Sequence, residues 1–309
     1  MWMIMINAVF VCTYLIAIVS MVELIFFLIK RMTKKEWNQY IILGIGGIIT
    51  AIVMANAYYL AHHVVETDYK VNTTKEIGTE QFRIVQISDS HLGSTMDGKK
   101  FSKYMQEINQ LRPDIVVITG DYVDEYTSYG DMVEGTEGLG KLQTKYGVYF
   151  VYGNHEKKEG SQQNYQDKDL RNELQKNHVI ILEDTVVEIT DNIVLVGRQD
   201  SSMKDRAMAS DLTKNIDKNK YIITLDHQPD DFEEEIKSQT DLVLSGHTHG
   251  GQLFPPGELR VLFGFINHLY GMEKRENTTF IVNAGISDCV LQFKMRTNSE
   301  YVVVDILKK

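Results

Sequence analysis

The hydrophobic residues of this chain follow two different patterns, and the change between them comes near residue 65. Residues 8–29 are interrupted only by Thr13, Ser20 and Glu23, and residues 40–60 contain no charged side chain. A helix that crosses the hydrocarbon core of a bilayer needs about 20 apolar residues, and both runs meet this length. The pattern predicts that residues 1–65 form a membrane anchor with two transmembrane helices, at about 8–29 and 38–60.

Two other interpretations of these apolar runs are a cleaved signal peptide and a buried hairpin of a soluble protein. A signal peptide is shorter and begins with basic residues, whereas the first ten residues of this chain contain none. A short basic connection between two charge-poor runs fits a membrane hairpin better than a pair of core helices.

The basic residues predict the orientation of this hairpin. All four Lys and Arg side chains near the two runs lie in the connection at residues 30–35, and none precedes the first run. Positively charged connections stay preferentially on the cytoplasmic side. We therefore expect a multi-pass protein of the cell membrane, with the N-terminus and the large C-terminal region outside the cytoplasm.

Beyond the hairpin, residues 66–81 are polar and lack apolar periodicity, which predicts a linker or the first edge of a domain. From residue 82 onward, short β-branched runs alternate with longer polar segments. The predicted strands are 82–87, 114–119, 148–152, 193–197, 221–225, 242–244, 279–283 and 301–307. The predicted helices are 102–111, 132–144, 167–176 and 232–238. This alternation is typical of an α/β sandwich and indicates one domain over residues 82–309.

Short runs of Asp, Asn, His and Gly follow five of these predicted strands directly. They are Asp89-Ser90-His91, Gly120-Asp121-Tyr122-Val123-Asp124, Gly153-Asn154-His155-Glu156, Asp226-His227 and Gly246-His247-Thr248-His249. Sites in α/β sheets collect beyond the carboxyl ends of the strands, so we expect these side chains to share one cleft. Any one fragment alone is more often a simple turn, but five of the nine histidines fall in this set.

The chemistry of the set points to metal ions. Alternate residues of an extended segment share a face, so Asp89 and His91 are able to reach one ion together. The same holds for His247 and His249 if their segment is extended. If it is an irregular loop, the two histidines would instead be divided between two ions. Oxygen and imidazole ligands without thiolate suit Mn, Fe or Zn. Only two cysteines occur, too few for a thiolate zinc site or a disulfide framework.

The net charge of the chain is −10, and residues 1–65 contribute +2 of it, which leaves about −12 for the remainder. Such an acidic domain disfavours general binding to nucleic acid, so we expect no nucleic-acid partner. Small phosphorylated substrates stay compatible with this charge, because bound cations reverse the potential locally.

In order and content the five fragments resemble the calcineurin-like metallophosphoesterase superfamily, whose pattern is D-x-H, G-D-x-x-D, G-N-H-[DE], H and G-H-x-H. The resemblance covers residues 82 to about 305. The run Gly246-His247-Thr248-His249-Gly250-Gly251-Gln252 further resembles the bacterial branch of membrane-associated phosphodiesterases. The fold that this resemblance implies is a β-sandwich flanked by helices (αββα).

The resemblance also implies a division of roles among the site residues. Two divalent ions would be held, one by Asp89, His91 and His249, the other by Asn154, His227 and His247, with Asp121 bridging both. His155 would face the substrate and stabilise developing charge or protonate the leaving alkoxide, and Asp124 would orient His155. Phosphoprotein phosphatases of this superfamily carry Arg-Gly after G-D-x-V-D, whereas this chain has Glu125-Tyr126, which makes that substrate class less fitting.

The function that follows is a membrane-anchored, metal-dependent hydrolase of phosphoric esters. It would cleave a phosphodiester or a phosphomonoester with a water activated between two metal ions. The membrane tether favours a small phosphorylated substrate that is linked to a lipid. The alternatives are a non-catalytic metal-binding scaffold on the same fold, which would be expected to lose ligands that are intact here, and a nuclease, which the acidic charge disfavours.

Residues 204–220 and 257–275 are expected to be loops near the cleft, with no role assigned to their side chains.

Overall fold

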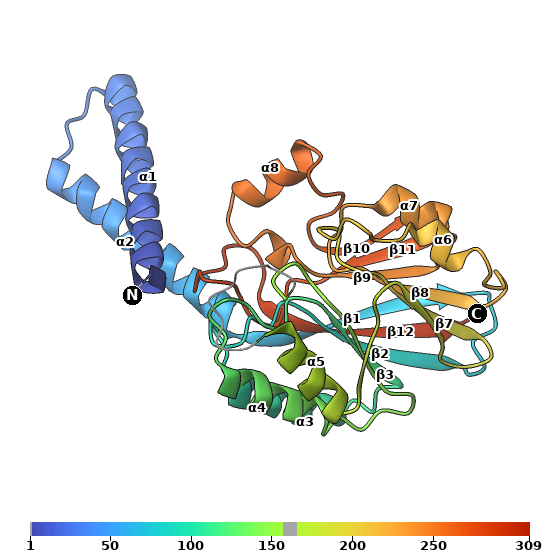
Figure 1. Cartoon of the computed structure of the whole chain (residues 1–309). Helices are drawn as coiled ribbons and strands as arrows, with labels where there is room; N and C mark the ends of the chain where they lie inside the picture. Colours follow the sequence, from blue (N-terminus) through green and yellow to red (C-terminus); the bar gives the residue numbers. More distant parts are fainter. Residues whose placement is uncertain (1, 157–165) are drawn as a thin grey trace.

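The computed structural model describes residues 2–156 and 166–309 and begins with two long apolar helices. These are α1 (Trp2–Thr33) and α2 (Gln39–His62), which stand out from the rest of the molecule as a hairpin (Figure 1). They pack closely, because a Cβ atom at Gly46 would lie only 2.9 Å from Val19 Cγ2. Both are long and apolar enough to cross a membrane, and little of either helix is buried inside the protein. The helix of a soluble core would instead be mostly buried.

The remainder of the described chain contains two six-stranded sheets. The first has the order β1-β12-β2-β3-β4-β5, and its central strands β2, β3 and β4 run parallel. Their bounds are β1 (Val64–Thr73), β2 (Gln81–Ile87), β3 (Ile115–Thr119), β4 (Val148–Val151), β5 (Val179–Ile181) and β12 (Ser299–Lys308).

The second sheet has the order β10-β11-β9-β8-β7-β6, with β11, β9, β8 and β7 parallel and an antiparallel strand at each edge. Its strands are β6 (Thr185–Glu188), β7 (Ile193–Gly197), β8 (Tyr221–Leu225), β9 (Leu242–Ser245), β10 (Gly271–Arg275) and β11 (Thr278–Val282). All five residues of β7 and of β8 are buried, as expected for strands that are covered on both faces.

The two sheets face each other across an apolar core, and helices cover their outer faces (Figure 1). Helices α3 (Gly98–Asn109), α4 (Tyr129–Leu139) and α5 (Asp167–Lys176) pack on the first sheet. Helix α7 (Phe232–Lys237) packs on the second through Phe232, which stacks on Phe280 of β11, and the short α6 (Ala209–Thr213) lies beside it. The molecule is therefore the αββα sandwich that the sequence predicts, preceded by two apolar helices.

The structure differs from the sequence prediction in four segments, one of which, residues 179–188, contains the unpredicted edge strands β5 and β6. The expected linker at 66–81 contains most of β1, which pairs with β12 at the edge of the first sheet. Polar residues alternate along β1 because one face of this edge strand meets water. The strand therefore contains no continuous apolar run that would predict it. The expected loops at 204–220 and 257–275 contain helix α6, most of helix α8 (Pro256–Leu262) and strand β10.

Removal of the Phe280 side chain should destabilise the sandwich strongly. The Phe232 and Phe280 rings lie 3.7 Å apart between α7 and the second sheet, and both are buried. We expect Phe280→Ala to lower the free energy of unfolding by about 3–5 kcal/mol, because a cavity replaces the ring. Urea unfolding of the detergent-solubilised protein, followed by circular dichroism, would measure this. Met208→Ala, at a side chain that is 61% exposed, is the control, and equal midpoints for both variants would contradict the prediction.

Candidate metal centre

The carboxyl ends of five strands from both sheets meet at one edge of the sandwich. Strands β2, β3 and β4 of the first sheet lead into the loops that carry Asp89, Asp121 and Asn154. Strands β8 and β9 of the second sheet lead into the loops with His227 and His247. Parallel strands within each sheet bring these loops together, so groups far apart in the sequence share one cleft.

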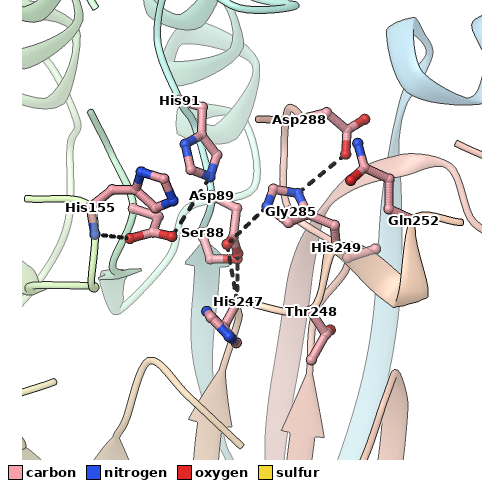
Figure 2. A network of polar contacts seen from close by, with 12 residues as sticks. Ser88, Asp89, His91, His155, His247, Thr248, His249, Gln252, Gly285 and Asp288 are labelled. Carbon is pink, nitrogen blue, oxygen red and sulfur yellow. Dashed lines mark hydrogen bonds and ion pairs between the residues drawn. The ribbon is translucent and has the colours of Figure 1, made fainter. Parts of the chain in front are cut away.

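One group in this cleft consists of Asp89, His91 and His249, all of them buried. One ligand atom from each lies within 4.8 Å of one atom from each of the others. His249 Nε2 is 3.6 Å from Asp89 Oδ1, and the rings of His91 and His249 are stacked with their centroids 5.1 Å apart. Figure 2 shows Asp89 among His91, His247 and His249. The arrangement offers two imidazoles and one carboxylate to a single ion.

A second group consists of Asp121, His227 and His247, with the same close spacing of ligand atoms. Asp121 Oδ2 lies 3.2 Å from His227 Nε2 and 3.7 Å from His91 Nε2, so one carboxylate oxygen faces both groups. Asn154 Oδ1 lies 3.2 Å from His227 Nε2 and adds an amide oxygen to the second group. All seven side chains that the sequence singled out as ligands are therefore together at one place.

The backbone at these positions is left-handed, which is costly for residues other than glycine. Asp89, His91, Asp121, His247 and His249 have φ between 37° and 69°. They are five of the twelve non-glycine residues with positive φ in the described part of the chain. Strained backbone of this kind persists where the surrounding structure enforces it and clusters at functional sites. Backbone strain therefore coincides with five of the seven candidate ligands.

Two glycines allow the loops to approach one another. Gly120 has φ +84°, and a Cβ atom there would lie 2.6 Å from His227 Nδ1. A Cβ atom at Gly246 would lie 2.4 Å from Asp89 Oδ2. A larger residue at either position would push a candidate ligand out of place.

The partner of Asp124 differs from the expectation. Asp124 Oδ2 lies 3.1 Å from Nδ1 of His91, whereas His155 Nδ1 lies 3.1 Å from Oε2 of Glu125. The two histidine rings are nearly perpendicular, with centroids 4.9 Å apart. Asp124 therefore orients the candidate ligand His91, and Glu125 takes the place beside His155 that we had expected Asp124 to occupy. Asp124 and Glu125 are neighbours in one motif, and the sequence alone does not determine which of them pairs with His155.

Three further residues belong to the cleft although the sequence did not single them out. Asp288 Oδ1 is 3.2 Å from His249 Nδ1, and its carboxylate is fully buried. The sulfur of Cys289 lies within 4.8 Å of ring nitrogens of His91 and His155. Glu156 accepts hydrogen bonds from the backbone N–H groups of the Asp121 and Gly153 loops and so ties these loops together. Of the three, only Glu156 stood inside a motif; the other two come from the loop after β11, which carries no motif.

Two acids and two arginines next to the cleft have structural roles. Asp226, directly before His227, accepts a hydrogen bond from Arg198 Nη1 at 3.0 Å and pairs with Arg206. Arg198 also pairs with Glu235 of α7 at 2.6 Å. These buried contacts attach the end of β8 to α7 and hold the loop that carries His227.

The charges in the cleft shift the pKa values of its members in opposite directions. Burial raises the pKa of the Asp121 carboxyl, but His227 and His91 outweigh it and hold this pKa well below its usual range. Burial and the neighbouring His227 lower the pKa of His247 to about 4, so its ring is neutral near neutral pH. Burial lowers the pKa of His227, but the charge of Asp121 outweighs this and raises it. The two histidines thus keep the carboxylate of Asp121 ionised in a buried space that otherwise disfavours charge.

The donor set fits divalent metal ions. His91 Nε2 is completely buried and has no hydrogen-bond partner among the described residues, yet it points toward Asp121 Oδ2. A buried polar atom without a partner is costly in a folded protein unless another group satisfies it. Imidazole nitrogens and carboxylate oxygens that converge in this way match the preferences of Mn, Fe and Zn.

The comparison with known families agrees with this geometry. The sequence model of the calcineurin-like phosphoesterase family matches residues 82–251, more than half of the chain, and the match spans all seven candidate ligands. The chain belongs to the calcineurin-like phosphoesterase family. It is accordingly a hydrolase of phosphoric ester bonds, as the sequence predicted.

Three relatives show how far the similarity of this phosphoesterase extends. An uncharacterized metallophosphoesterase of Aquifex aeolicus is 36% identical over 202 residues, which cover 63% of this chain and 74% of the relative. An uncharacterized metallophosphoesterase of Campylobacter jejuni is 27% identical, and the match covers 91% of this chain and 75% of the relative. A transmembrane protein with metallophosphoesterase domain from Danio rerio is 30% identical, and the match covers 71% of this chain and 51% of the relative. The name of this third relative and the two apolar helices support association with a membrane.

Loss of the Asp288 charge should weaken metal binding without removing a candidate ligand. Asp288 lies against Nδ1 of His249, and the partner that orients a metal-binding imidazole typically contributes 10–100-fold to affinity. We expect Asp288→Asn to raise the dissociation constant for Mn²⁺ by about tenfold or more. Isothermal titration calorimetry on the purified full-length phosphoesterase would measure this. Asp191→Asn, at an exposed turn, is the control, and indistinguishable affinities of the two variants would contradict the prediction.

Proposed function

We propose that this protein is a membrane-anchored phosphoesterase that uses two divalent metal ions to hydrolyse a phosphodiester or a phosphomonoester. The observation that carries the proposal is the pair of ligand groups that face one another across Asp121. In this proposal residues 1–65 anchor the protein and residues 82–309, joined at the sheet edge by β1, form the catalytic domain. The basic connection at 30–35 supports a position of that domain on the outer side of the cell membrane.

The ligands divide between the two ions as the two groups do. Asp89, His91 and His249 would hold one ion, Asn154, His227 and His247 would hold the other, and Asp121 would contribute to both. The positions of Asp121 Oδ2 and Asn154 Oδ1 support this assignment, because both oxygens lie against His227 Nε2. When bound, a pair of divalent ions supplies the Lewis acidity that polarises a phosphoryl oxygen and makes a water molecule nucleophilic.

His155 is proposed to act on the leaving group. Its backbone N–H donates to Asp121 Oδ1 at 2.9 Å, which fixes the residue beside the ligands. Its Nδ1 is held by Glu125, so the proton that His155 delivers to the leaving oxygen would come from Nε2.

Arg260 is proposed to contact the substrate phosphate. Its Nη2 atom is 3.2 Å from His247 Nε2, so the guanidinium reaches from α8 into the cleft. Guanidinium groups bind phosphate oxygens in pairs and are always charged. The sequence alone did not assign this arginine, because it lies in a segment without a motif.

The membrane anchor supports a substrate that is itself held at the membrane. Asn7 of α1 donates a hydrogen bond to the carbonyl oxygen of Val290, and the neighbouring Cys289 lies at the cleft, so a phosphoester carried by a lipid would be near the site. A small phosphorylated compound with a lipid attached is therefore the proposed substrate class.

Loss of a single candidate ligand should abolish hydrolysis. We expect the wild-type protein with Mn²⁺ to cleave bis-p-nitrophenyl phosphate, p-nitrophenyl phosphate or both, and Asn154→Ala and His247→Ala to reduce the rate by about 10³-fold or more. Release of p-nitrophenol measures the rate. Gln199→Ala, outside the two ligand groups, is the control. A wild-type protein that binds Mn²⁺ but cleaves neither ester would make a metal-binding scaffold the better description.

Substitution of His155 should lower the rate of the chemical step while metal binding persists. We expect His155→Gln to reduce kcat by about 10²–10⁴-fold, because a positioned proton donor contributes that much. The loss should be smaller for p-nitrophenyl esters, whose leaving group needs little protonation, than for alkyl esters. A uniform loss for both kinds of ester, or a loss of metal, would show that His155 does not donate the proton.

A further inference from the structure

An exposed apolar surface surrounds helix α8. It follows the 3₁₀ turn at His249–Gly251 and occupies residues 254–265; we name it the α8 surface. Its large side chains are mostly exposed, at 61% for Phe254, 75% for Leu262, 67% for Phe263 and 69% for Phe265. Contiguous exposed groups of this size on a soluble domain mark an interaction site.

The α8 surface lies beside the apolar hairpin. Tyr14 Oη of α1 donates a hydrogen bond to the carbonyl oxygen of Phe254 at 2.6 Å. Tyr14 is the seventh residue of the apolar run that starts at residue 8, and a helix rises about 1.5 Å per residue. The start of the α8 surface is therefore level with the first two turns of the run that crosses the membrane. Figure 1 shows α8 on the side of the sandwich from which α1 rises.

A second set of contacts fixes the hairpin to the sandwich at this place. Asn7 Nδ2 donates to the carbonyl oxygen of Val290 at 3.0 Å, and the N–H of Gln292 donates to Asn7 Oδ1 at 2.9 Å. The Phe10 and Phe293 rings are 5.4 Å apart. The level of the α8 surface relative to the membrane thus depends on several contacts and not on Tyr14 alone.

An apolar cavity of about 530 Å³ lies between α8 and the segment that precedes β10. Leu259, Val261, Leu262 and Leu269 line it, and the ion pair of Glu258 with Arg296 lies at its wall. The volume is within the range of pockets that bind small ligands. His268 and Tyr270 also line the cavity, but its four aliphatic side chains offer the apolar contacts that an alkyl chain needs.

The same helix reaches the metal centre. Arg260 lies between Leu259 and Val261 in the sequence, and its guanidinium contacts His247. A phosphate near His247 and an alkyl chain in the cavity would therefore be held by adjacent residues of one short helix.

We propose that the α8 surface is seated in the bilayer that α1 and α2 enter, and that the cavity behind α8 takes an alkyl chain of a lipid phosphoester. The bilayer is the occupant that the contact with the apolar part of α1 favours. The choice of substrate class rests on the proposed hydrolase function, whereas the seating in the bilayer does not.

The seating is tested by fluorescence in vesicles. Phe263→Trp is introduced into the full-length chain, whose two native tryptophans, Trp2 and Trp37, are replaced by Phe. The protein is reconstituted in phosphatidylcholine vesicles with brominated acyl chains, which quench tryptophan only at short range. We expect strong quenching and blue-shifted emission for Phe263→Trp. The control is Met208→Trp in the same background, because Met208 is equally exposed but lies next to α6 (Figure 1).

Equal emission wavelength and equal quenching of the two variants in vesicles would contradict the proposal that the α8 surface lies in the bilayer. Protection of residue 263 only in a dimer, or only after addition of another protein, would overturn it as well and assign the surface to that partner. The outcome does not depend on catalysis, so an inactive protein with a quenched residue 263 would refute the hydrolase and leave the seating intact.

The cavity is tested by inhibition of p-nitrophenyl phosphate hydrolysis, or by Mn²⁺-dependent binding if that ester is not cleaved. We expect dodecyl phosphate, used below its micellar concentration, to bind about tenfold or more tightly than butyl phosphate, because the longer chain buries more apolar area. Leu269→Ser should remove most of this difference, and Met208→Ser should retain it. Equal affinities for the two alkyl phosphates in the wild-type protein would overturn the assignment of the cavity.

Discussion

The carboxylate of Asp121 is buried between the ends of the two sheets, and the positions of the other groups in the cleft depend on it. A buried charge needs partners, and Asp121 finds them in imidazoles from both sheets and in the backbone N–H of His155. Its own backbone is left-handed, and the carboxylate of Glu156 fixes it through the N–H group. The proposed metal ions would complete this set by satisfying nitrogens, such as His91 Nε2, that the described protein atoms leave without a partner.

The loop between β11 and β12, residues 283–298, connects the cleft to the hairpin. At one end Asp288 faces His249, and the buried Lys294 lies 3.4 Å from the same carboxylate. At the other end Phe293 packs on Phe10 and Tyr58 of the two apolar helices, and the N–H of Lys294 donates to the carbonyl oxygen of Ala57. One loop therefore touches both the candidate metal centre and the two apolar helices. The α8 surface provides a second connection between the same two regions.

The sequence was sufficient for the layers of the sandwich and for the position of the site. Strands such as β7 and β8 were predicted at their observed bounds, because a strand covered on both faces is apolar throughout. The gathering of the motifs followed from the rule that sites lie beyond the carboxyl ends of strands. Edge strands were missed where one face is polar, as in β1. The pairing of Asp124 with His91, and of Glu125 with His155, depends on side-chain directions within an irregular loop, and no periodicity encodes these. Asp288 and Cys289 lay outside every motif, and only the packing of the chain brings them to the cleft.

The contacts of residues 290–294 with α1 and α2 bear on how this protein is best prepared. Deletion of the two apolar helices is the usual route to a soluble phosphoesterase domain, but here it would uncover Phe293 and leave Gln292, Lys294 and Ser299 without their partners Asn7, Ala57 and Ala61. The freed loop carries Asp288, so the orientation of His249 would be lost along with the anchor. A shortened chain that binds metal poorly would then report on the missing helices rather than on the native centre, and detergent-solubilised or nanodisc-embedded full-length protein is the appropriate material.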